Sequence, residues 1–418
     1  MANHEPEQPQ ITEETVLSTE AGGLAADPLA AAADATVLGQ SPVQVRPTAT
    51  AMPVPGLPPR TAAPAVPSVT SPVAPAATPR TPSRPTAMPQ PAAGASTLTA
   101  DQITRFSTQF EAIVRNVSQV VVGKEPPVRQ CVTALVAGGH ILLEDYPGTG
   151  KTQLARGLAR SIDTSFKRIQ FTPDLLPSDV VGVTFYDQKT GEFSFRKGPI
   201  FASIVLADEI NRASPKTQSA LLEVMEEQKV TVDGATYDVP QPFAVIATQN
   251  PVEQLGTYKL PEAQMDRFLI KTTIGYPSHE SSVDILRQIN IGDRATHVSP
   301  VATGADVLAM RTLAQSVHID DAIYEYIVRL VESTRHHESI AVGSSMRGAL
   351  ALTLCARVWA AADNRGYVIP DDVKALAVPV LAHRVLLTSE ALFTALTAEQ
   401  VVAQILEEVP APAQSAAI

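Results

Sequence analysis

Residues 141–152 read Ile-Leu-Leu-Glu-Asp-Tyr-Pro-Gly-Thr-Gly-Lys-Thr, an apolar run that passes directly into a glycine-bracketed Lys-Thr pair. This order is typical of a strand, a phosphate-binding loop and the start of a helix. Gly148 and Gly150 let backbone N–H groups approach phosphate oxygens, because neither carries a side chain. Lys151 is predicted to reach the β- and γ-phosphates, and Thr152 to ligate Mg²⁺. The loop therefore favours an α/β fold with a parallel sheet.

One position departs from the general pattern G-x-x-x-x-G-K-T. Asp145 stands where that pattern has its first glycine. The same residues also fit an ordinary strand, turn and helix in which Gly and Pro only punctuate the turn. The motif therefore needs further polar strand ends before it predicts a nucleotide site.

The apolar run 203–207 supplies one such strand end, because Asp208 and Glu209 follow it directly. It is typical of a buried parallel strand with carboxylates at its C-terminal edge. Asp208 is predicted to hold Mg²⁺ opposite Thr152, and Glu209 to activate the attacking water as general base. An acidic helix cap is the alternative interpretation of the pair.

Two later residues extend the pattern. A third strand is predicted over 242–250 and ends in Asn250, whose amide could bond the γ-phosphate or the lytic water. Asn before Pro is also an ordinary turn residue. Arg267 follows in a short segment predicted to be helical, where its planar guanidinium could meet a phosphate. A surface ion pair is the alternative for a single arginine.

Composition narrows the class of protein. The chain has 418 residues, of which 44% are hydrophobic and 18% charged, enough to bury the cores of two or three domains. Its net charge of −11 gives no field that would attract nucleic acid, so nucleic acid is not an expected partner. Cys131 and Cys355 lie far apart in apolar contexts and are predicted to be buried, reduced thiols.

The ends of the chain carry different signals. The first residues lack the basic and apolar regions of a signal peptide, and no apolar run reaches the roughly 20 residues of a membrane span. A soluble cytoplasmic protein is expected. Residues 1–98 are rich in Pro, Ala and Thr and are predicted to be a disordered tail, either a tether or docking arm or a plain spacer. Order is predicted to begin with the capping box of Thr99 and Gln102.

Taken in order, these blocks resemble the MoxR family of AAA+ ATPases from about Phe106 to Leu406. The blocks that carry the resemblance are Leu142–Thr152, Gln170–Asp179, Gly198–Phe201, Leu206–Arg212, Lys216–Glu223, Ala247–Pro251 and Gly256–Phe268. An acidic residue at position 145 is familiar in this family. The resemblance implies a P-loop αβα sandwich over 99–277, a connecting segment over 278–312 and a small all-α lid over 313–410.

The resemblance also implies a role for each candidate site residue. Lys151 and Thr152 match Walker A, while Asp208 and Glu209 match Walker B. Asn250 matches sensor 1. Arg267 matches the arginine that AAA+ proteins insert into a neighbour's site. Arg347 matches sensor 2 and is expected to reach the γ-phosphate from the lid, although Met346 stands where Pro is usual. The other positions implied at the nucleotide are Val122, Gly123, Pro147, Gly148, Thr149, Gly150 and Gln153.

The activity implied by the resemblance is ATP hydrolysis with Mg²⁺ in a homo-hexameric ring. Such a ring is expected to remodel or mature client proteins or metalloenzyme complexes, with a von Willebrand factor A domain protein as partner. A nucleic-acid-directed P-loop motor and a chelatase-like metal-insertion motor subunit are the alternatives. A nucleotide-dependent scaffold without hydrolysis is a third, although Glu209 argues against it.

Two predicted hairpins lie outside the nucleotide motifs. One covers 184–195 with a turn around Gly191, and the other covers 230–239 with an Asp233-Gly234 turn. Within the resemblance they match the family's inserts. We expect them to contact the remodelled partner; scaffold strands without a binding role are the alternative.

Overall fold

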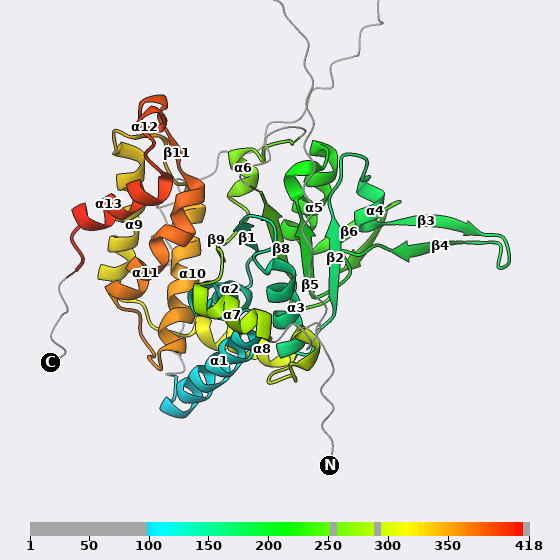
Figure 1. The fold of residues 1–418 in the computed structure, drawn as a ribbon, viewed down its shortest axis with the longest axis horizontal. Helices are drawn as coiled ribbons and strands as arrows, with labels where there is room; N and C mark the ends of the chain where they lie inside the picture. Colours follow the sequence, from blue (N-terminus) through cyan, green and yellow to red (C-terminus); the bar gives the residue numbers. More distant parts are fainter. Residues whose placement is uncertain (1–97, 251–256, 288–293, 413–418) are drawn as a thin grey trace, which may run out of the picture. The chain divides into compact units, whose positions relative to one another are not determined.

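The computed structural model describes residues 98–250, 257–287 and 294–412, so the predicted tail lies outside the described residues except for Leu98. A five-stranded sheet of order β2-β5-β8-β1-β9 lies at the centre (Figure 1). All of its neighbouring strands pair in parallel, which confirms the predicted parallel sheet. The strands are β1 (Ile141–Glu144), β2 (Phe166–Gln170), β5 (Ile204–Asp208), β8 (Ala244–Gln249) and β9 (Ile270–Thr272).

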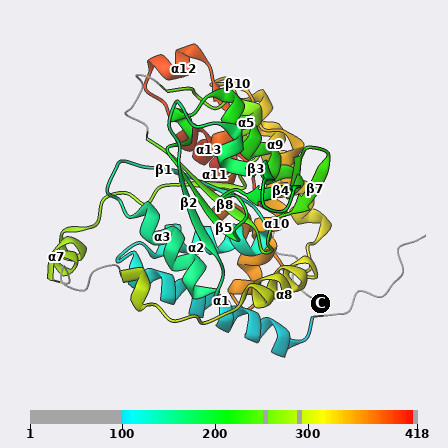
Figure 2. The same cartoon turned by 90° about the vertical axis from the view of Figure 1, so that its right-hand side faces the viewer.

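Helices cover both faces of this sheet. Ile141 and Leu143 of β1 enter one buried cluster and Leu142 enters another, because successive strand residues point to opposite faces. The first cluster includes α1 (Ala100–Val120), α2 (Glu125–Ala137) and α3 (Lys151–Ser161), and the second includes α4 (Pro177–Val181) and α5 (Pro215–Glu227). The layers are therefore helix, sheet and helix, as predicted (Figures 1 and 2).

Two further predictions are confirmed, one at the start of α1 and one for the cysteines. The Thr99 hydroxyl accepts the Gln102 N–H at 3.3 Å, and the Gln102 side chain accepts the Thr99 N–H at 2.9 Å, so α1 begins in a capping box. Cys131 and Cys355 are buried free thiols, and burial raises the pKa of each to about 12.

The C-terminal lid is mainly helical. It consists of α9 (Asp321–His336), α10 (Met346–Ala362), α11 (Pro370–Leu381), α12 (Ser389–Phe393) and α13 (Ala398–Glu408). It also contains a small antiparallel ladder of β10 (Ile340–Val342) and β11 (Leu386–Leu387), which the sequence did not predict. The predicted connecting segment contains α7 (His279–Arg287) and most of α8 (Gly304–Gln315), which runs past the predicted boundary at residue 312. Across the described parts of the chain, no helix is both long and apolar enough to cross a membrane.

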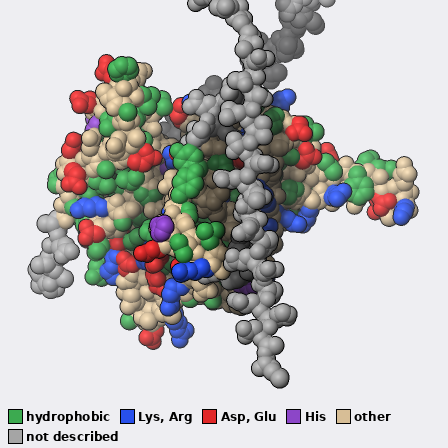
Figure 3. Space-filling model, in the orientation of Figure 1, with side chains coloured by type: hydrophobic (Ala, Val, Ile, Leu, Met, Phe, Trp, Pro, Cys, Tyr) green, Lys and Arg blue, Asp and Glu red, His purple; other side chains and the backbone are tan. Residues whose placement is uncertain are grey.

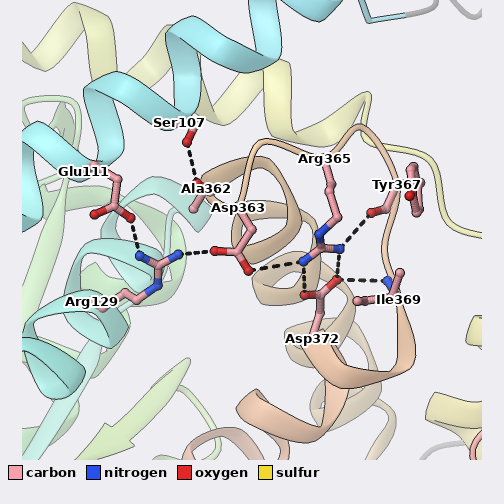
Figure 4. A network of polar contacts seen from close by, with 9 residues as sticks. All are labelled: Ser107, Glu111, Arg129, Ala362, Asp363, Arg365, Tyr367, Ile369 and Asp372. Atoms are coloured by element: carbon pink, nitrogen blue, oxygen red, sulfur yellow. Dashed lines mark hydrogen bonds and ion pairs between the residues drawn. The ribbon is translucent and has the colours of Figure 1, made fainter.

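A charged network joins the first helical face to the lid (Figure 4). Arg129 on α2 pairs with Glu111 on α1 and with Asp363, which follows α10. Arg365 pairs with Asp363 at 3.2 Å and with Asp372 of α11 at 2.5 Å. The lid also shares its buried cluster with α1 and α2. These contacts hold the C-terminal helices against α1 and α2.

Both predicted hairpins are present. One is β3 (Gly182–Asp187) with β4 (Glu192–Lys197), and the other is β6 (Lys229–Val232) with β7 (Ala235–Asp238). The rings of Phe195 and Tyr237 stack at 4.4 Å, so the hairpins support each other near their bases. Farther along β4, Phe193 is 77% exposed, and hydrophobic side chains gather on this projecting hairpin (Figure 3).

Candidate nucleotide site

The predicted polar strand ends meet at one edge of the sheet. Strand β8 lies between β5 and β1, so Asn250 lies between the acidic pair and the P-loop. Thr248 on β8 donates its hydroxyl to Asp208 at 2.6 Å and accepts the backbone N–H of Glu209 at 2.9 Å. The Asp145 N–H donates to the carbonyl of Gln249 at 3.1 Å, so the P-loop leaves the sheet directly beside β8. The carboxyl ends of parallel strands are the usual place for a ligand in such folds.

A cavity of about 320 Å³ opens along the P-loop. Five of the residues predicted at the nucleotide line it, namely Val122, Gly148, Thr149, Gly150 and Gln153, and Gly123 and Pro147 each adjoin a lining residue in the chain. The sequence did not single out the opposite wall. That wall comes from Lys124 and from the segment after β9, with Gly275, Pro277, Ile285 and Arg294.

The loop can accept a polyphosphate. Gly148 and Gly150 have φ values of 84° and 95°, a left-handed conformation that favours glycine. A Cβ added at Gly148 would meet no atom within 4 Å, so the loop backbone is open to an incoming oxygen. Helix α3 begins after Gly150 without a side-chain cap, which leaves its first N–H groups for an anion. The Gln153 Oε1 atom is buried and has no hydrogen-bond partner among the described residues.

Lys151 lies folded inside this loop. Its ammonium donates to the carbonyls of Asp145 at 2.8 Å and Tyr146 at 3.0 Å. Partial burial lowers its pKa, and the charges of Asp208, Asp145 and Glu209 oppose that shift. The amine can exchange its two carbonyl acceptors for phosphate oxygens without leaving the loop.

Asp145 explains the missing glycine. Its carboxylate, only 3% exposed, accepts the backbone N–H groups of Ile274 at 2.5 Å and Gly275 at 2.9 Å. A glycine at this position could make neither bond. The Tyr146 and Tyr276 rings also stack across the same junction, with centroids 5.6 Å apart. Asp145 therefore ties the P-loop to the far wall of the cavity.

The oxygen donors here fit Mg²⁺ held together with a nucleotide. Thr152 lies in the first turn of α3, and Asp208 ends β5, so one hydroxyl and one carboxylate are available. Mg²⁺ typically takes one or two carboxylates, keeps several waters and binds phosphate oxygens. When bound, it neutralises charge on the β- and γ-phosphates. Arg168 on β2 donates to Asp208 from Nε at 3.1 Å and is a neighbour that the sequence did not predict.

Glu209 is held in a specific orientation. Its φ is 58°, a strained left-handed conformation for a residue other than glycine, as is often found at functional sites. Its Oε2 atom accepts from Gln170 at 2.8 Å and pairs with Arg212 at 3.0 Å. No role was predicted for Gln170, which is the last residue of β2 and lies in register with Asp208.

The two remaining predicted residues, Arg267 and Arg347, lie together elsewhere. Arg267 pairs with Glu226 on α5 at 2.9 Å and donates to the Leu222 carbonyl at 2.6 Å. Arg347, at the start of α10, reaches the other oxygen of Glu226 at 2.9 Å. Both arginines line a second cavity of about 330 Å³, together with His140.

This second cavity lies at the opposite edge of the sheet. The Leu269 N–H, two residues after Arg267, donates to the carbonyl of His140, which immediately precedes β1. The P-loop begins at the other end of β1, five residues later, or roughly 16 Å along a strand. Arg267 is therefore not brought to the P-loop of its own chain, and neither is Arg347, which shares its carboxylate partner.

Comparison with known proteins agrees with this arrangement. Residues 140–270 match the ATPase family associated with various cellular activities (AAA), and residues 332–405 match the AAA lid domain. Chaperone MoxR1 of Mycobacterium tuberculosis is 40% identical over 331 residues, which cover 77% of this chain and 86% of MoxR1. The chain belongs to the MoxR family of AAA+ ATPases.

Other relatives extend the match. Uncharacterized protein YeaC of Bacillus subtilis is 51% identical over 73% of this chain and 95% of YeaC. Protein MoxR of Methylorubrum extorquens is 30% identical over 71% of the chain and 94% of that protein. A crystal structure described as a candidate ATPase from Cytophaga hutchinsonii superimposes with a TM-score of 0.70, at 39% identity over 75% of this chain and 98% of the other. The predicted family and fold are confirmed, while the roles of individual residues stay predictions.

Proposed function

We propose that this MoxR-family chain hydrolyses ATP with Mg²⁺ at a site that a second copy of the chain completes. The observation that carries the proposal is the separation of Arg267 and Arg347 from the P-loop across the sheet. A developing negative charge on a transferred phosphoryl group needs such cationic donors. When two copies of the chain assemble, both arginines of one copy can act on the phosphate bound at the P-loop of the other copy.

Each residue of the first chain has a defined task in this proposal. Lys151 and the loop N–H groups bind the phosphates, and Thr152 and Asp208 hold the metal. Asn250 orients the attacking water, and Glu209 takes its proton. Gln170 and Arg212 both contact Oε2 of Glu209, so they fix the orientation of its carboxylate. Arg347 then acts beside Arg267 from the neighbouring chain, not from the lid of the same chain.

The two surfaces that meet in this assembly are different. One carries the P-loop cavity and the other carries the arginines, so the contact is head to tail. Repeated head-to-tail contacts close into a ring when the rotation between copies permits. A hexamer is the ring size that the family resemblance favours.

We propose a chaperone-like task in the cytoplasm for this ring. A relative is named Chaperone MoxR1, and the β3–β4 hairpin presents exposed aromatic rings that the nucleotide site does not use. Such rings can bind apolar segments of a client protein. Maturation of a metalloenzyme complex with a von Willebrand factor A domain partner is the finer form of this proposal.

Turnover is expected to depend on chain concentration. Because each site needs a neighbour's arginines, ATP hydrolysis per chain should fall when the ring dissociates on dilution. A steady-state assay over a dilution series, paired with sedimentation velocity in the presence of ATP, measures both quantities on the same samples. A dilute monomer with undiminished turnover per chain would refute the shared site.

Phe193→Ser is expected to leave basal ATP hydrolysis intact while reducing suppression of protein aggregation by more than half. The ring of Phe193 is exposed on the hairpin, packs against Tyr186 and does not line the P-loop cavity. Its loss therefore removes apolar surface from the hairpin and leaves the residues of that cavity in place. Light scattering of heat-denatured citrate synthase with ATP provides the readout. Phe393→Ser is the matched control, because Phe393 is 92% exposed on the lid. Equal suppression by the hairpin variant and wild type would exclude the hairpin as a client contact.

A further inference from the structure

The backbone on both sides of Arg267 is held by the lid. Arg384 donates from Nη1 to the carbonyl of Asp266 at 3.0 Å and from Nη2 to the carbonyl of Phe268 at 2.6 Å. It also pairs with the Asp266 carboxylate, while its Nε donates to the carbonyl of Val380, near the end of α11, at 2.8 Å. One guanidinium thus grips the residue before and the residue after Arg267.

Two more lid residues act on the same segment. The Ser345 hydroxyl donates to Asp266 Oδ2 at 3.1 Å, from the residue that caps α10. His383 bonds the Phe268 carbonyl through Nε2 at 2.9 Å. Burial, with a smaller contribution from Arg384, lowers the pKa of His383 to about 3, so the neutral ring donates here. These contacts therefore restrict the movement of the peptide groups on both sides of Arg267.

The chemistry of this contact requires arginine. The Arg384 side chain is only 3% exposed, and its planar fork satisfies two carbonyls and one carboxylate at once. A lysine is a point charge and cannot bridge both carbonyls in a fixed geometry. Burial lowers the pKa of Arg384, while Asp266 opposes that shift and keeps the buried charge paired.

We propose that Arg384 is a positioning residue that fixes the presentation of Arg267 to the neighbouring chain. The inference rests on the proposed shared site. Arg384 bonds the carbonyls of Asp266 and Phe268, so it acts through the backbone on either side of Arg267. Because a displacement of about 1 Å can cost on the order of 10² in rate, loosening this grip should weaken the neighbour's hydrolysis.

A double-mutant cycle separates this role from general stability. Arg384→Gln is expected to lower kcat about 10- to 100-fold, with the affinity for a fluorescent ATP analogue and the sedimentation coefficient unchanged. In an Arg267→Ala background the same change should cause no further loss, since the residue it positions is gone. Arg384→Lys should show an intermediate kcat and guards against a glutamine variant that fails to fold. An equal loss in both backgrounds would overturn the proposal.

Mixed rings provide a second readout that a purely structural role would not move. Arg384→Gln chains keep their own site, and Glu209→Gln chains keep an intact Arg267. Mixed one to one, about half of the intact sites face a neighbour whose Arg267 is still held by Arg384. These sites should recover, giving about a quarter of wild-type turnover per chain in a random head-to-tail ring. No gain on mixing would overturn the positioning role.

Matched variants make the outcomes distinguishable. Arg365→Gln is the control, because Arg365 is another largely buried lid arginine but pairs with Asp372 instead of with residues 266–268. This variant should retain wild-type turnover below its melting temperature. Full turnover in Arg267→Ala would defeat the shared site itself. If turnover were lost in Arg267→Ala but complete in Arg384→Gln, only the inference about Arg384 would be wrong.

Discussion

Replacing Glu209 with glutamine should lower ATP turnover by about 10²- to 10⁴-fold, the usual contribution of a general base. Glutamine has the same size, and its side-chain oxygen can still accept hydrogen bonds from Gln170 and Arg212. Its amide cannot accept the proton of the attacking water. Nucleotide binding should survive, because the P-loop and Lys151 are untouched. Single-turnover hydrolysis measures the chemical step, and equilibrium titration with a fluorescent ATP analogue measures binding.

Glu325→Gln is the control for this experiment, since Glu325 is exposed on α9. It should hydrolyse ATP at the wild-type rate. If Glu209→Gln matched it, Glu209 would not be the base. A variant that lost nucleotide binding along with turnover would instead assign Glu209 to binding.

Arg267→Ala is expected to reduce turnover by about 10³- to 10⁵-fold, the range known for arginines that stabilise a phosphoryl-transfer transition state from a neighbouring chain. The substitution removes a charge from the far edge of the sheet and should leave ATP affinity unchanged in the same chain. Steady-state kinetics and sedimentation velocity with ATP together distinguish lost chemistry from lost assembly.

The decisive control for Arg267 is again complementation. An equal mixture of Arg267→Ala and Glu209→Gln chains should hydrolyse ATP faster than either variant alone, because some intact sites then receive an intact arginine. Arg105→Ala, at an exposed position on α1, should behave as wild type. If mixing restored nothing while both variants still formed rings, Arg267 would serve its own chain or none.

Much of the fold follows from short segments of sequence. The α1 capping box is set by neighbouring residues, as are strands β5 and β8, which end at Asp208 and just before Asn250. Their pattern therefore predicts them. The same holds for the P-loop, whose glycines precede Lys151. The predicted hairpins also depend on local turns such as Asp233-Gly234.

Other parts of the site depend on contacts between distant residues. Asp145 bonds a backbone N–H 129 positions away, and Arg347 meets Glu226 across 121 positions. A local sequence pattern cannot contain such distant pairs. Only the structure shows the role of the Asp145 carboxylate and the contact of Arg267 and Arg347 with Glu226. The grip of Arg384 on the carbonyl of Phe268, 116 positions earlier, was hidden for the same reason.

Strand β9 connects two features that the chain places only seven residues apart, Arg267 before it and Ile274 after it. Ile274 and Gly275 are held by the P-loop through Asp145, so one end of the strand follows the nucleotide of its own chain. The other end carries the arginine offered to the next chain. In a head-to-tail ring, β9 would therefore connect the nucleotide site of its own chain with the site of the next chain. Because coupling between two binding sites is reciprocal, the nucleotide in each site would affect binding at the other.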